Sequence, residues 1–219
     1  MHASERTVME KISLVIYLIL MCSMMVMLIY SLWIHNRIFV FGSFFGTLLS
    51  LIILIIARVL NVILPWPLEL GIIMMIFLHV VGGSVGLYKI FPPYDSIVHF
   101  TSSALIGFSV LTMAYLLNKH ANAAFKITLP LMVLLSITCA ATMGMLWEIG
   151  EFAFDQLFGW GQQYGLYDTM IDLTIDTAGG MAGGIVGGLL IKLEKFSSVI
   201  QSLDKSAERL AVRWGVEGT

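Results

Sequence analysis

Long apolar runs alternate with short polar or Pro- and Gly-containing breaks along most of the chain. A helix that crosses a bilayer needs roughly 20 mostly apolar residues, and six runs are that long. The breaks between them carry turn-forming residues, such as the Pro-Trp-Pro at 65–67, the pair at 92–93 and the Gly- and aromatic-rich segment 159–167. The predicted spans are 12–34, 38–57, 68–90, 97–117, 127–149 and 170–191. We therefore expect an all-α polytopic membrane protein of about six helices, packed as one bundle over 1–192.

Composition supports the membrane class. The chain is 58% hydrophobic and 12% charged, with a mean hydropathy of +0.92, and a soluble fold of this size would leave much of that apolar surface uncovered. The first run is about twice as long as a signal-peptide core and has no small-residue cleavage site, so we expect it to be retained. Membrane lipids are the expected surroundings, the cell membrane the expected location, and no nucleic acid is expected as a partner.

The basic residues predict an orientation. Six spans put both termini on one side, together with the second and fourth connections. Ten of the 12 Lys and Arg residues fall on that side, and only Arg37 and Lys89 fall on the other. This asymmetry predicts cytoplasmic termini. Residues 193–219 are expected to form an amphipathic tail on the cytoplasmic surface.

Carboxylates gather at three predicted helix ends. The stretch between Lys126 and Lys192 contains no basic residue but has acids at helical spacing, and an Asp-His pair one turn apart opens the fourth span. The spans place all three ends on the non-cytoplasmic side, so we expect a single site there. Its candidate members are Asp95, His99, Glu148, Glu151, Asp155, Asp168, Asp172 and Asp176.

The last acid stripe continues into a row of glycines, Gly180, Gly184 and Gly188, and small residues at this spacing mark close helix packing. The acids of this helix should therefore face the bundle. Asp168 and Asp176 lie about 12 Å apart along the helix axis, which is too far for one ion to touch both. The stripe predicts either a site of two layers or a graded path.

So many carboxylates at close range require either protonation or a bound cation. Oxygen donors with one imidazole suit Mn, Zn, Mg or Ca, and the histidine disfavours Mg and Ca. His99 and Glu151 are the candidate acid/base residues, and Asp168 and Asp155 are expected to line the site. The candidate metal ligands are Asp95, His99, Glu148, Asp172 and Asp176.

Simpler roles compete for some of these residues. Asp95 or Asp168 alone is explained as a helix N-cap favoured by the macrodipole. Asp155 is better explained as a solvated interfacial residue. The N-cap explanation weakens for Asp172 and Asp176, because they lie one to two turns inside their helix.

Three motifs carry a family resemblance: FPPYDSIVHFTSSALIGF, WEIGEFAFDQLFG and DTMIDLTIDTAGGMAGGIVGG. In this order they resemble the YjdF-like family of bacterial and archaeal membrane proteins, over about residues 62–191. They are also similar to a wider VanZ-like arrangement, although the Asp-to-His spacing here is one residue longer. The first resemblance implies no particular reaction, and the second implies cell-envelope lipid or wall chemistry. The matching residues are Asp95, His99, Glu148, Glu151, Asp168, Asp172 and Asp176.

Three functions follow from these patterns and stay open at this point. The first is an envelope enzyme that uses a metal on a lipid-linked or phosphate-bearing substrate. The second is a cation or proton translocator. The third is a non-catalytic membrane protein whose polar cluster joins helix ends around an ion.

Overall fold

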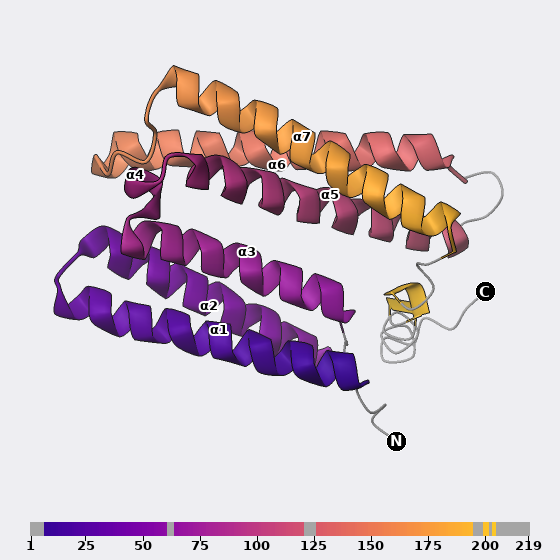
Figure 1. Ribbon diagram of the computed structural model, residues 1–219, viewed down its shortest axis with the longest axis horizontal. Coiled ribbons are helices and arrows are strands. Elements are labelled where there is room, and N and C mark those ends of the chain that lie inside the picture. The colour runs from indigo at the N-terminus through magenta and orange to yellow at the C-terminus, as the bar shows by residue number, and fades with distance from the viewer. Residues whose placement is uncertain (1–6, 61–63, 121–125, 195–198, 202, 205–219) are drawn as a thin grey trace. The chain divides into compact units, whose positions relative to one another are not determined.

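The computed structural model describes residues 7–60, 64–120, 126–194, 199–201 and 203–204. These residues form helices and connecting turns, without a strand (Figure 1). The helices are α1 (Val8–Trp33), α2 (Arg37–Val59), α3 (Trp66–Val85), α4 (Leu87–Ile90), α5 (Pro93–His120), α6 (Leu129–Phe158) and α7 (Leu166–Lys192). All but α4 are long and apolar enough to cross a membrane. The predicted all-α class with six spans is confirmed.

These helices leave apolar side chains uncovered. In the most apolar window of each long helix, at most 39% of the residues are buried within the protein. The remaining apolar surface requires lipid, because contiguous exposure of this extent is not stable in water.

Most helix ends differ from the predicted bounds, and a glycine explains the two largest differences. The third span ends at Val85, five residues early, because Gly86 adopts a left-handed conformation with φ of 77°. The fifth span extends to Phe158, where Gly159 ends α6 with φ of 64°. Glu151 and Asp155 therefore lie inside α6.

The chain divides into two compact units, residues 1–87 with 197–219, and residues 88–196. In the first, α1, α2 and α3 pack against one another around a core that contains Tyr17, Met24 and Ile73. Thr7 and Glu10 form a capping box at the start of α1, and Asn36 caps α2. The packing of all six helices as one bundle stays a prediction, as does the orientation. Most of the expected tail at 193–219 lies outside the described residues.

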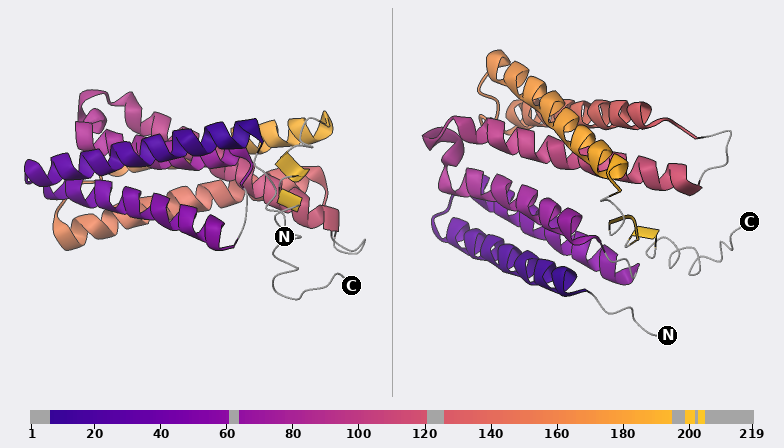
Figure 2. Two further views of the ribbon diagram at one scale, coloured as in Figure 1. Left: turned by 90° about the horizontal axis from the view of Figure 1, so that it is seen from below. Right: turned by 45° about the vertical axis from the view of Figure 1, so that its right-hand side comes forward.

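In the second unit, α5, α6 and α7 pack against one another, and α7 crosses α5 obliquely (Figures 1 and 2). Glycines make this close packing possible. A Cβ on Gly179 would lie 2.5 Å from the backbone oxygen of Phe100 on α5, and one on Gly183 would collide with the backbone oxygen of Ala104. Gly180, Gly184 and Gly188 lie on the other side of α7, against α6. Thus one row of glycines on α7 packs against α5, and a second row packs against α6.

Candidate functional site

Small-residue stripes on α6 and α7 lead into the acidic cluster. On α6 the buried residues recur every fourth position, in the order Met132, Ser136, Ala140, Gly144 and Glu148. On α7 the buried acids Asp172 and Asp176 precede the buried glycines. Since residues four apart share a helix face, the stripes that let these helices approach also turn their acids toward α5.

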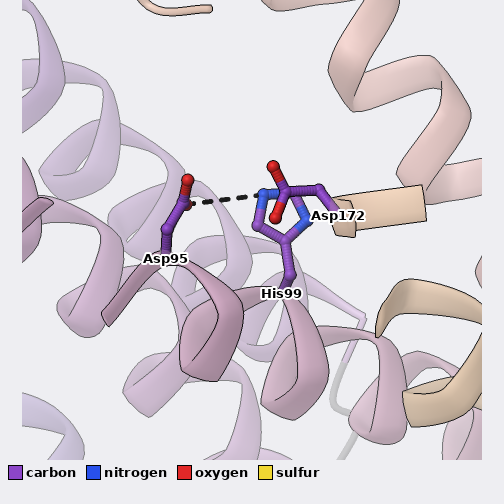
Figure 3. A group of neighbouring side chains, drawn as sticks. All are labelled: Asp95, His99 and Asp172. Carbon is purple, nitrogen blue, oxygen red and sulfur yellow. Dashed lines mark ion pairs between the residues drawn. The ribbon is translucent and has the colours of Figure 1, made fainter. Parts of the chain in front are cut away.

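His99 of α5 lies at the centre of the cluster. Its Nδ1 is 3.1 Å from Oδ2 of Asp176. Its Nε2 lies 3.6 Å from Oδ1 of Asp95 and 4.0 Å from Oε1 of Glu148. The side chains of Asp95, His99 and Asp172 converge from α5 and α7 (Figure 3), and one ligand atom from each lies within 4.8 Å of the others. The four acids that we expected to be metal ligands thus lie around the imidazole of the fifth, His99.

Most of this cluster is removed from solvent. Glu148, Asp172 and Asp176 are 5%, 3% and 2% exposed, and only Asp95 is partly open, with 21% of its side chain accessible. Neither Lys nor Arg occurs between Lys89 and Lys119 or between Lys126 and Lys192. Four carboxyl groups therefore face one imidazole. In this setting they must either be protonated or be neutralised by a bound cation.

Glu148 stands out within the cluster. Its Oε1 is buried and accepts no hydrogen bond, a condition shared by one other side-chain atom in the described part of the chain. A buried carboxylate oxygen without a donor costs free energy on folding. This oxygen is directed at the Nε2 side of His99, where a cation would satisfy it.

The other expected site residues lie further out. Glu151 is half-buried and accepts a hydrogen bond of 2.9 Å from Trp147 Nε1, which gives that tryptophan a polar partner on its own helix. Asp168 is half-buried in the first turn of α7. Both are within electrostatic range of Asp95. The structure brings them to the rim of the cluster and not to His99.

Asp155 anchors the α6–α7 connection. Its carboxylate accepts hydrogen bonds from the backbone N–H groups of Gln162 and Gln163, at 2.7 and 2.9 Å. The side chain of Gln163 in turn donates to the Glu148 carbonyl and to Thr169. The expectation that Asp155 is a solvated interfacial residue is incomplete, because this carboxylate organises the loop over the end of the site.

The Asp155→Ala variant is expected to loosen this loop. Loss of two charge-assisted hydrogen bonds should lower the local opening free energy by about 1.5 kcal/mol, or roughly tenfold in exchange rate. Hydrogen exchange at residues 159–165 measures this effect. Asp155→Asn retains one acceptor oxygen and should show an intermediate rate. Equal exchange in all three proteins would contradict the assigned role.

Several residues of the site were missed from sequence. Ser103 and Gly144 contact Asp176, and each had a signal, because Ser103 lies one turn after His99 and Gly144 one turn before Glu148. No sequence signal indicated Tyr88 or Tyr164, which lie outside the six long helices of the structure. Burial, followed by the charge of Asp95, raises the pKa of both phenols. Both remain neutral hydrogen-bond donors near the open side of the cluster.

Comparison with known proteins places the chain in a family. The family described as "Predicted membrane protein (DUF2238)" matches residues 16–192, which include all of the site. An uncharacterized protein of Thermotoga maritima is 32% identical over 112 residues, 50% of this chain and 56% of the relative. The chain thus spans little more than half the length of that relative. No solved structure matches the chain. The match over most of its length shows that the chain belongs to the DUF2238 family of predicted membrane proteins.

Proposed function

We propose that this protein binds a divalent metal ion between α5, α6 and α7, and uses it in chemistry on a lipid-linked or phosphate-bearing substrate of the cell envelope. The buried oxygen of Glu148 carries the proposal, because it has no hydrogen-bond donor and points at His99 Nε2. An acidic cluster alone is a weak indication of a metal. A buried ligand atom that lacks any donor is a stronger one.

The distances around Nε2 suit a metal. Ligand atoms held about 2.1 Å from one tetrahedral ion lie roughly 3.4 Å apart. The Nε2 atom is 3.6 Å from Asp95 Oδ1 and 4.0 Å from Glu148 Oε1, so small side-chain movements would bring these atoms into coordination. Asp172 supplies a further carboxylate. One nitrogen with several oxygens favours Zn or Mn over Mg or Ca.

The inner end of the site is closed. From Asp176 inward, the three helices carry no charged side chain over residues 100–118, 129–147 and 177–191. The glycines of α7 bring its backbone against α5 and α6 over this region. An acidic cluster that adjoins closely packed, uncharged helix surfaces suits binding and chemistry better than translocation, which needs a route to both sides.

Each residue then has a role. The metal would polarise a substrate oxygen or activate water, and it would supply positive charge within segments 90–118 and 127–191, which contain no Lys or Arg. Asp95, Glu148 and Asp172 would hold the ion with His99. Because both ring nitrogens of His99 are then engaged, Glu151 at the rim is the candidate for proton transfer. The proposal also includes a site on the non-cytoplasmic face, and the YjdF-like and VanZ-like resemblance of the motifs supports it.

Elemental analysis of the purified protein tests metal binding. We expect about one equivalent of Zn or Mn in the wild type and a large loss in Asp172→Ala and His99→Ala. Thr174→Ala is a matched control, because Thr174 lies on the exposed side of α7 and bonds only the backbone oxygen of Met170 among the described contacts. Absence of a bound divalent ion in the wild type removes the proposal.

A second measurement tests the chemistry. Metal-loaded protein in nanodiscs with a lipid phosphate should release inorganic phosphate, and Asp172→Ala should not. If the protein binds metal but releases no phosphate, the metal site stands and the proposed substrate class is wrong. Metal flux in proteoliposomes would instead favour the translocator.

A further inference from the structure

The two ring nitrogens of His99 have different surroundings. The Nδ1 atom faces the buried interior of the three-helix unit, where Oδ2 of Asp176 lies 3.1 Å away. The Nε2 atom faces the partly open side, toward Asp95 and Glu148. Asp172 and Asp176 therefore differ in position, although both are buried acids on the same face of α7.

Asp176 is held from three directions. Its Oδ1 accepts a 2.6 Å hydrogen bond from Ser103, one turn after His99 on α5. On the α6 side the carboxylate lies against Gly144, where an added Cβ would collide with it. Asp176 is only 2% exposed. A carboxylate that is so enclosed, with both oxygens engaged by Ser103 and His99, has little freedom to turn toward an ion on the Nε2 side.

This arrangement has a direct consequence for the imidazole. A neutral imidazole carries its proton on one nitrogen and offers the lone pair of the other. A buried carboxylate beside Nδ1 favours a proton on that atom, since the N–H then donates to it. The lone pair is left on Nε2, which faces Asp95 and Glu148. Histidines that bind metals commonly donate their second N–H to a carboxylate in this way.

We propose that Asp176 is a positioning residue and not a metal ligand: with Ser103 and Gly144, it holds His99 so that Nε2 binds the metal. This inference rests on the proposed metal site and revises our expectation from sequence, which placed Asp176 among the ligands. It divides the acids of α7 into an outer ligand, Asp172, and an inner support, Asp176.

The test is Asp176→Asn, in protein labelled with ¹⁵N-histidine. The amide keeps the size of the side chain, but its NH₂ group can donate to Nδ1 and so move the imidazole proton to Nε2. We expect metal affinity to fall roughly 10- to 100-fold, with Zn as the probe. Ser103→Ala leaves the Asp176–His99 contact in place and should cause a smaller loss. If Asp176→Asn does not fold, the test is whether Ser103→Ala lowers metal affinity, because Ser103 holds the Asp176 carboxylate.

Solid-state NMR supplies a measurement that general destabilisation would not change. The chain has five histidines, and the signal absent from His99→Ala identifies the one of interest. In the wild type we expect Nδ1 protonated and Nε2 shifted by metal, and in Asp176→Asn without metal we expect the proton on Nε2. Metal bound at Nδ1, or unchanged affinity in Asp176→Asn, would overturn the inference.

The two proposals fail differently. If the wild type binds no metal, the proposed function is lost, while the change that Asp176→Asn causes in the Nδ1 signal of His99 still reports whether Asp176 contacts and holds the ring. If the wild type binds metal and Asp176→Asn binds it equally well, the metal site stands and the role of Asp176 is wrong.

Discussion

The Glu148→Met variant is expected to be more stable than the wild type without metal and to lose most of the stabilisation that metal confers. Methionine has a volume similar to that of glutamate but no polar oxygen. It removes the buried atom that lacks a hydrogen-bond donor and one negative charge beside the other acids. Relief of this desolvation cost should raise the free energy of unfolding by about 1–3 kcal/mol.

Metal is expected to offset this difference in stability. At a free metal concentration of 100 Kd, binding should stabilise the wild type by about 2.7 kcal/mol, and the variant should gain little. Denaturant unfolding in detergent, with Zn and with chelator, measures both quantities. Glu151→Met is the matched control on the same helix: its carboxylate has a donor in Trp147, so the response to metal should be retained. A metal-free Glu148→Met protein that is less stable than the wild type would contradict this account.

Gly183→Ala is expected to be the most damaging small change in the α5–α7 packing. The added Cβ would collide with the backbone oxygen of Ala104, and a backbone atom cannot rotate away as a side chain can. We expect α5 and α7 to separate locally, at a cost of about 1–3 kcal/mol in the free energy of unfolding. Metal affinity should fall as well, because His99 on α5 and Asp172 on α7 would move apart.

The control uses the same substitution where space is free. A Cβ on Gly150, in α6, would meet no atom within 4 Å. Gly150→Ala should therefore be neutral or stabilising by up to about 1 kcal/mol, since alanine is the better helix former. Unfolding titrations of the two variants side by side measure the difference. Equal stabilities would show that the glycine rows do not determine how closely α5 and α7 pack.

Much of the fold was predictable because each long helix is encoded locally. A run of some 20 apolar residues has one stable arrangement in lipid, with its backbone hydrogen bonds formed internally. The ends were less predictable. Gly86 and Gly159 both end helices in a left-handed conformation, but glycines are frequent elsewhere in this chain, 20 in all, and most of those in α7 pack against a neighbouring helix.

The grouping of the acids was also predictable. Helical spacing placed Asp95 with His99 and Asp172 with Asp176, and the order of the spans brought the three helix ends to one level. The rotation of α6 was the missing information. It turns Glu148 inward and leaves Glu151 at the rim, because Ala140 and Gly144 are the residues that contact α7.

The sequence by itself therefore determined the membrane class, the six helices and the set of acids that meet at their ends, since hydropathy and helical period are local properties of the chain. Only the tertiary structure separated the positions within that set. Whether a carboxylate faces Nε2 of His99, as Glu148 does, or Nδ1, as Asp176 does, depends on how closely and at what rotation three helices pack. That packing is decided by contacts between residues far apart in the chain.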